Sequence, residues 1–360
     1  MGGNGLENVP EEIARHPCFS AAAQHKFARL HLPVAPGCNI SCNYCNRKYD
    51  CLNESRPGVT SEVLPPEGAA KKFSWVKSQL ANLSVVGIAG PGDALADWAN
   101  TAQTVKLVRE QAADIIFCLS TNGLLLPRYA QDIMALGIRN VTVTVNAVDP
   151  AIGAKIYRRV NYDNKVYTGE EAARILLTNQ LAGIRQLVAG GGLVKINIVM
   201  IPGINDKHIP AVVKKVKELG VLVTNIMPMI SAPGSAFEFL PPTSMKEVTA
   251  MRDACAAEIP QMRHCRQCRA DAVGLLGEDR SAEFRCALDR PAADPPGKGK
   301  RYKIAVTSKY GKLVDLHFGY ATEFAIYYTD GRQSELVEKR RAPKYCAGPE
   351  NCDAAEDRKE

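Results

Sequence analysis

Apolar, β-branched runs alternate with amphipathic stretches through the first two thirds of the chain. The apolar runs cover residues 30–35, 83–89, 114–119, 141–147, 194–201 and 221–229. Stretches with helical spacing of apolar positions lie between them, including residues 69–80, 102–112, 172–181 and 209–219. Nearly continuous apolar strands separated by helices predict a parallel sheet with helices covering its faces.

Six such units predict an α/β fold, a partial TIM-like (βα)6 barrel that is open on one side. A doubly wound open sheet has the same order of elements and remains the alternative. In a barrel, functional residues lie on the loops after the strands. Turn-rich sequences are found at these places, at residues 35–37, 90–93, 120–123 and 202–206.

The pattern changes after about residue 240. Residues 244–262 have helical periodicity, and a linker rich in Pro, Gly and Ala follows at 291–300. A tail then begins with a strand at 302–306, a short loop at 313–318 and a strand at 323–328. We therefore expect an N-terminal ligand segment (1–30), the barrel (31–240), a C-terminal extension (241–290), the linker (291–300) and a small α/β domain (301–360).

Composition and charge indicate the cellular location of the protein and the classes of partner that it does not bind. The chain has no run of about 20 apolar residues that could span a membrane, and its acidic N-terminus is not a signal peptide. The net charge of +7 is modest. No aromatic stacking platform is interleaved with the basic residues at 298–303 and 339–341, which disfavours a nucleic-acid site. We expect a cytoplasmic protein, in which twelve cysteines predict metal ligation and not disulfides.

Three cysteines form the strongest motif. Cys38, Cys42 and Cys45 have C-x3-C-x2-C spacing directly after the first predicted strand. Three thiolates on one loop can hold three irons of a [4Fe–4S] cubane and leave the fourth iron open. A structural zinc site or incidental buried thiols would be the alternative on spacing alone. With Tyr44 before the last cysteine and this place in the barrel, the motif resembles that of the radical SAM superfamily.

This resemblance implies an S-adenosylmethionine (SAM) site. The open iron would bind the amino and carboxylate groups of SAM, and an electron from the cluster would cleave the sulfonium to give a 5′-deoxyadenosyl radical. Gly90, Gly92 and Asp93 stand where family members carry a Gly-Gly-Glu-like stretch that contacts SAM. Further candidate contacts near strand ends, which could equally cap helices, are Asn122, Asn146 and Asn197.

More potential ligands are present than one cluster needs. By plausible reach, Cys51, Cys118 and a histidine make one three-point site, and Cys18, Cys265 and Cys268 make another, since thiolate and imidazole both ligate iron. The candidate imidazoles are His25, the first choice because it lies in an irregular segment near Cys18, and His31, which falls within a predicted strand. Cys255 and Cys286 are expected to be small buried hydrophobes.

A closer resemblance covers residues 15–290. The segments that carry it are 16–36, 46–51, 54–58, 86–93 and 265–272, and they resemble the NifB family of nitrogenase-cofactor maturases. The resemblance implies two [4Fe–4S] substrate clusters besides the SAM cluster, which fuse with a SAM-derived carbide and an added sulfur into an [8Fe–9S–C] precursor. Glu54 and Arg56 would position the clusters or assist proton movement; a salt-bridged loop is the alternative for this pair.

The resemblance also implies partners: iron–sulfur cluster donors, an electron donor, and downstream scaffold or carrier proteins for the cofactor. The tail resembles the start of NifX-like carrier domains, notably at residues 314–319. That family domain is longer than the tail, so we expect an incomplete or degenerate domain. Its capacity to bind cofactor, and any role of His317, Cys346 or Cys352, stay open.

Two other functions fit parts of the pattern. Another radical SAM enzyme with auxiliary clusters would share the C-x3-C-x2-C motif, and a non-catalytic iron–sulfur scaffold would share the surplus of ligands. Three clusters predict about twelve irons per chain, whereas a simple radical SAM enzyme would hold about four. A scaffold would form neither 5′-deoxyadenosine nor S-adenosylhomocysteine from SAM.

Overall fold

The computed structural model describes residues 11–53, 58, 60, 62–284, 302–308, 323–329 and 333–341. The chain divides into two compact units, Met1–Cys286 and Ala287–Glu360. The predicted positions Glu54 and Arg56, the linker 291–300 and the loop 313–318 lie outside the described residues, as do His317, Cys286, Cys346 and Cys352.

The first unit contains an eight-stranded sheet in the order β11-β10-β1-β3-β4-β5-β8-β9. Its parallel part consists of β1 (Ala28–His31), β3 (Leu83–Ile88), β4 (Ile116–Thr121), β5 (Asn140–Thr144), β8 (Leu193–Met200) and β9 (Val223–Pro228). These strands neighbour one another in chain order, without the reversal of a doubly wound sheet. The predicted partial (βα)6 barrel is confirmed.

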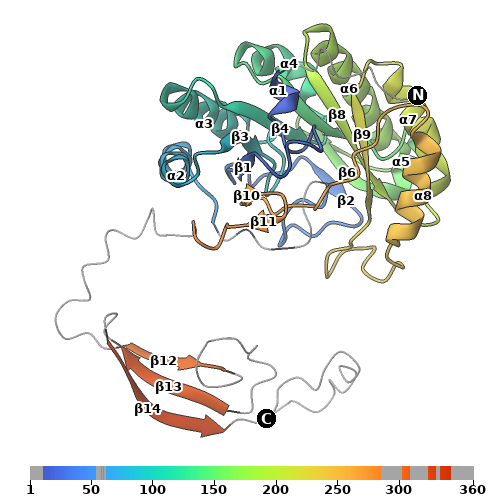
Figure 1. The fold of residues 1–360 in the computed structure, drawn as a ribbon. Coiled ribbons are helices and arrows are strands. Elements are labelled where there is room, and N and C mark those ends of the chain that lie inside the picture. Colours follow the sequence, from blue (N-terminus) through green and yellow to red (C-terminus); the bar gives the residue numbers. More distant parts are fainter. Residues whose placement is uncertain are drawn as a thin grey trace, which may run out of the picture. The chain divides into compact units, whose positions relative to one another are not determined.

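Helices cover the outer face of this sheet (Figure 1). They are α2 (Pro66–Gln79), α3 (Trp98–Gln111), α4 (Leu126–Ala135), α6 (Gly169–Ala189), α7 (Ile209–Lys217) and α8 (Met245–Cys255), with the shorter α1 (Glu11–Ala14), α5 (Pro150–Ile156) and the 3-10 turn Asp206–His208. Helix α8 begins at a capping box in which Ser244 and Glu247 satisfy each other's backbone N–H groups. Helices α4 and α6 pack so closely that a Cβ on Gly183 would lie 2.1 Å from the Cβ of Leu126.

Several short elements were not predicted. Strand β10 (Val273–Leu275) pairs antiparallel with β1, and β11 (Glu278–Asp279) follows it. A separate sheet joins β2 (Ile40–Cys42) to the hairpin β6 (Tyr157–Tyr162) and β7 (Lys165–Tyr167). The hairpin turn uses Asp163 and Asn164 at positive φ, which is typical of a type I′ turn.

The barrel strands have two different faces. On β8, Val194, Ile196 and Ile198 pack into the main hydrophobic core, whereas Lys195 and Asn197 line a pocket with side chains from other strands. Because side chains alternate along a strand, the barrel strands direct their apolar set to the helices and a polar set to the lumen. The lumen is therefore lined by polar side chains that can contact a ligand.

The second unit contains an antiparallel sheet of β12 (Tyr302–Val306), β13 (Glu323–Thr329) and β14 (Ser334–Arg341). The first two strands match the predicted positions; β14 was missed because its mostly charged sequence lacks an apolar run. Across the described part of both units, no helix combines the length and the apolar character needed to cross a membrane.

Candidate cluster-binding site

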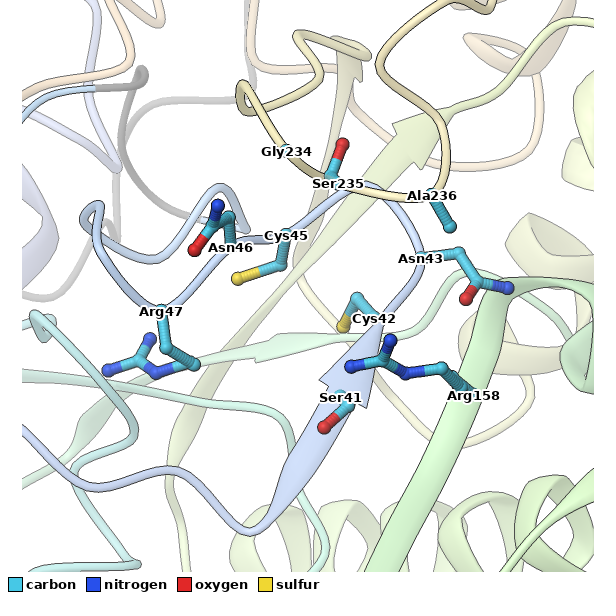
Figure 2. A pocket seen from close by; sticks show the side chains of 10 residues that line it. All are labelled: Ser41, Cys42, Asn43, Cys45, Asn46, Arg47, Arg158, Gly234, Ser235 and Ala236. Carbon is cyan, nitrogen blue, oxygen red and sulfur yellow. The ribbon is translucent and has the colours of Figure 1, made fainter.

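The loop that carries the C-x3-C-x2-C motif follows β1 and is closed by a hydrogen bond from the backbone N of Cys45 to the carbonyl oxygen of Cys42, at 3.1 Å. A hollow of about 260 Å³ opens beside this loop (Figure 2). Its lining includes Cys42, Cys45 and the guanidinium groups of Arg47 and Arg158. The segment after β9 packs over the loop, where the N–H of Ala232 donates to the carbonyl of Tyr44 at 3.0 Å.

The thiols of this loop suit a cubane. Burial raises the pKa of Cys38 to about 12, with nearby Cys45 adding to the rise. Burial also raises the pKa of Cys42 well above its usual value, with both other thiols contributing. Thiols so close together and so little solvated can ionise by binding metal, which displaces their protons. No three His, Cys, Asp or Glu side chains in the described part converge on a single metal ion. A cubane gives each thiolate its own iron, so a three-cysteine loop fits a cluster without such convergence.

The glycine-rich loop after β3 lies directly against the cysteine loop. The N–H of Gly92 donates to Ala35 at 2.7 Å, and the N–H of Asp93 donates to Gly37 at 2.7 Å. A Cβ on Gly92 would lie 1.9 Å from the carbonyl oxygen of Gly37. Gly90, at a φ of 135°, completes a turn that side chains rarely allow. The glycines are therefore needed for contact between the two loops.

Asp93 has a different set of contacts from the one expected. Its buried carboxylate accepts hydrogen bonds from the hydroxyl of Thr121 at 3.0 Å, the N–H of Asn122 at 2.6 Å and the N–H of Leu95 at 3.0 Å. Burial raises the pKa of Asp93, and these donors oppose the rise. The carboxylate thus joins the loop after β3 to the loop after β4 and does not offer free acceptors to a ligand.

The three asparagines expected to contact the cofactor tie the cysteine loop to the strands. Their side-chain amides donate from Asn122 to Asn39 Oδ1 at 2.7 Å, from Asn146 to the Tyr44 hydroxyl at 2.8 Å, and from Asn197 to the Asn53 carbonyl at 2.8 Å. Asn122 and Asn146 follow the ends of β4 and β5, whereas Asn197 lies within β8, and the partners of all three belong to residues 39–53. Their observed role is to position that loop.

Arg47 also connects the two loops. Its guanidinium donates to the carbonyl of Pro36 at 2.7 Å and to that of Pro91 at 3.1 Å. Burial tends to lower its pKa, but nearby thiols, including Cys38 and Cys51, raise it overall. A fixed positive charge therefore stands beside the thiols of the motif.

A second pocket lies deeper in the barrel, and we call it the lumen pocket. It is lined by potential metal ligands from four parts of the chain: Cys18, His31, Cys118, Cys265 and Cys268. Two cations, Lys195 and Arg266, line it too, and its described lining includes no carboxylate. Residues separated by up to 250 positions in sequence thus form one thiol-rich cavity.

His31 and His25 are placed very differently. His31 lines the lumen pocket, and its Nδ1–H donates to the carbonyl of Arg269 at 3.0 Å, which leaves Nε2 for a metal. Burial lowers the pKa of His31 to about 4, so the ring is neutral, as a ligand must be. His25 is exposed in the turn before β1. The geometry therefore favours His31, against the preference drawn from the sequence.

The predicted ligand groups are partly rearranged. Cys118 and His31 line the lumen pocket together, as do Cys18, Cys265 and Cys268. Cys51 is placed near the cysteine loop, where Cys38 and Cys45 raise its pKa in addition to burial. All cysteines in the described part are unbridged, and Cys255 packs in the main core as expected.

Two buried cations of the site were missed. Arg29 donates from Nη1 to the carbonyl of Leu275 at 2.7 Å and from Nη2 to the Sγ of Cys268 at 3.3 Å. Lys195 is 5% exposed in the lumen pocket. The available signal was a charged residue within an otherwise apolar strand, which is rarely buried without a function.

Comparison with known proteins agrees with this site. Residues 32–216 match the model of the radical SAM superfamily, and residues 300–359 match that of the dinitrogenase iron-molybdenum cofactor family. Among solved structures, SuiB from Streptococcus suis bound to S-adenosylmethionine has a TM-score of 0.45 and 12% identity, over 66% of this chain and 50% of SuiB. The chain is a radical SAM enzyme with a second, cofactor-type domain.

Curated relatives are more specific. The FeMo cofactor biosynthesis protein NifB of Herbaspirillum seropedicae is 46% identical over 94% of this chain and 72% of its own length. That of Klebsiella pneumoniae is 45% identical over 96% of this chain and 79% of its own length. The chain therefore belongs to the NifB family of FeMo cofactor biosynthesis proteins.

Proposed function

We propose that this enzyme fuses two [4Fe–4S] substrate clusters, with a SAM-derived carbide and an added sulfur, into the [8Fe–9S–C] precursor of the nitrogenase cofactor. The observation that carries the proposal is the lumen pocket. It offers four thiols and an imidazole in one cavity of a radical SAM barrel, more ligands than one three-cysteine cluster needs.

Cys38, Cys42 and Cys45 would hold the resident cluster. SAM bound to this cluster would supply a methyl group for transfer and, after reductive cleavage, a 5′-deoxyadenosyl radical for hydrogen abstraction. Residues of the chain hold the loops in position. Asp93 joins the loops after β3 and β4, and Asn122 is hydrogen-bonded to the cysteine loop. The backbone of Gly90 and Gly92 remains our candidate for approach to SAM.

For the substrate clusters, we propose that Cys51, Cys118 and His31 hold one and that Cys18, Cys265 and Cys268 hold the other. The lumen lining supports all of these except Cys51, which lies toward the resident cluster. Glu54 and Arg56, next to Cys51 in sequence, are proposed to position the substrate cluster that Cys51 would hold or to move protons.

We also propose the partners expected from the sequence. Iron–sulfur donors would load the lumen pocket, a reductant would supply electrons, and scaffold or carrier proteins would take up the product. The family match of residues 300–359 supports a role of the tail in holding or passing on the cofactor. The unbridged thiols suit the reducing cytoplasm expected for the chain.

Two single-residue variants test the assignment, with Cys255→Ala as a control for loss of a buried thiol outside both sites. Cys42→Ala should abolish the formation of 5′-deoxyadenosine and S-adenosylhomocysteine while iron remains in the lumen pocket. Cys268→Ala should keep reductive SAM cleavage and lose the fused product. Product is measured as activation of cofactor-deficient nitrogenase extracts, and iron as irons per chain.

The outcomes separate the alternatives. About four irons per chain in the wild type would identify a radical SAM enzyme without substrate clusters. Iron in the lumen pocket without any SAM-derived product would leave a scaffold. Full product from Cys268→Ala would refute the ligand grouping.

A further inference from the structure

Lys195 occupies an unusual place for a lysine. It lies in β8, whose eight residues are all buried, and pairs with Thr142 on one side and Val223 on the other. Its neighbours in sequence, Val194 and Ile196, pack into the main core. The alternation of side chains therefore directs Lys195 into the lumen.

Potential metal ligands surround Lys195 in the lumen pocket. The residue lines the same pocket as Cys18, Cys265 and Cys268, and its Nζ lies 5.3 Å from the ring centroid of Phe19, next to Cys18 in sequence. Burial raises the pKa of Cys18 and of Cys265, and the positive charge of Lys195 opposes that rise.

We propose that Lys195 is an anion-binding residue of the lumen pocket, and that its ammonium holds the iron–sulfur substrate by charge without ligating iron. The inference rests on the proposed function, because it requires a cluster in that pocket. It adds a selection rule: the pocket takes an anionic cluster and disfavours a free cationic iron.

The physical reason is charge balance. A [4Fe–4S] core of charge 2+ bound by three thiolates carries a net charge of about −1, and it becomes more negative on reduction or on binding sulfide. Burying such an anion is costly unless a positive group compensates it. An ammonium fixed in a strand can donate hydrogen bonds to cluster sulfides, and such bonds raise the reduction potential of a cluster.

Lysine is suited to this task because it cannot replace a ligand while protonated. Arg29 complements it, since it donates to the Sγ of Cys268 and is held by β10 carbonyls. Arg29 thus acts on a ligand sulfur, whereas the side chain of Lys195 lines the cavity from β8.

The test compares full-length wild type with Lys195→Met and Lys195→Arg, each purified without clusters and then loaded with iron and sulfide. The first readout is the iron retained in a fixed time against a chelator. We expect Lys195→Met to retain lumen iron at least about tenfold less well, which corresponds to a loss of about 1.4 kcal/mol. Lys195→Arg should recover most of the difference, because it restores the charge.

The second readout is the increase in melting temperature on loading, measured for each variant. Comparing loaded and cluster-free forms of one variant cancels whatever Lys195 contributes to the empty protein. The increase should be smaller in Lys195→Met. The third readout is the midpoint potential of the lumen clusters, which should shift to more negative values in Lys195→Met and return in Lys195→Arg.

Failure of the inference and failure of the proposed function look different. If the wild type takes up only the four irons of one cluster, the proposed function fails. If the wild type loads the lumen and Lys195→Met matches it in retention, thermal shift and potential, the inference is overturned. Equal losses in Lys195→Met and Lys195→Arg would also overturn it, because shape and not charge would then matter. Phe19→Leu, which removes the ring beside the ammonium, should leave lumen iron in place.

Discussion

Replacing Gly92 by alanine tests the contact between the glycine-rich loop and the cysteine loop. The added Cβ would lie 1.9 Å from the carbonyl oxygen of Gly37 and 2.7 Å from that of Pro36. Both are backbone atoms, so no side-chain rotation relieves the overlap. Since real Cβ contacts lie at 3.0 Å or more, the loops must separate by about 1 Å.

This separation acts on the motif directly, because Gly37 precedes Cys38. Misplacement of reacting groups by about 1 Å can cost about 100-fold in rate, so 5′-deoxyadenosine formation should fall by about that factor. Overpacking of this kind costs about 1–3 kcal/mol of folding stability. The chain should still fold, since residues 36–38 and 90–93 are not members of the main core, which the strands and helices largely form.

The assay is anaerobic turnover of SAM with a chemical reductant, with 5′-deoxyadenosine measured at saturating SAM and over a range of SAM concentrations. Gly277→Ala is the matched control, because its Cβ would meet nothing within 4 Å. A Gly92→Ala enzyme that cleaves SAM within about threefold of Gly277→Ala would refute the argument that loop contact sets the geometry of the site.

Three further changes test other parts of the structure. Tyr44→Phe removes a buried hydroxyl that accepts from Asn146 at 2.8 Å and donates to Asn53. We expect the free energy of unfolding, measured by urea titration, to fall by about 1–3 kcal/mol. An unchanged midpoint would contradict this. Lys72→Met leaves Glu62 without its buried partner, so unfolding should become easier by about 3 kcal/mol, with Lys71→Met as the exposed control. Ser244→Ala removes the cap of α8 and should cost about 1 kcal/mol in the same titration.

The barrel was predictable because its signal is repeated and local. The parallel strands are largely buried on both faces and are rich in apolar and β-branched residues, and six such runs separated by helices define the architecture. The C-x3-C-x2-C motif was equally local, since one loop carries all three cysteines. Strand β14 had no such signal: its described side chains are mostly exposed, and pairing with β13 alone defines it.

The surroundings of His25 and His31 were not evident from the sequence. The first strand was predicted at 30–35, but β1 covers Ala28–His31. His31 is thus the last residue of the strand and alternates with the core residue Leu30, which directs it to the lumen. In a strand at 30–35, His31 would lie near the start, whereas in β1 it lies at the carboxyl end, where the functional residues of a barrel are found.

The asparagines show a more general limit. Asn122 and Asn146 do follow strand ends, whereas Asn197 lies within β8, and amides at such places can meet a ligand. The chain itself can supply the partners of such amides, however: Asn146, with 0% exposure, both donates to Tyr44 and accepts from the N–H of Val199. Sequence alone does not tell which polar residues face a ligand and which hold the loop that does. Lys195 and Arg29 are more informative, because a charge inside an apolar strand has few reasons to be there other than the contents of the lumen.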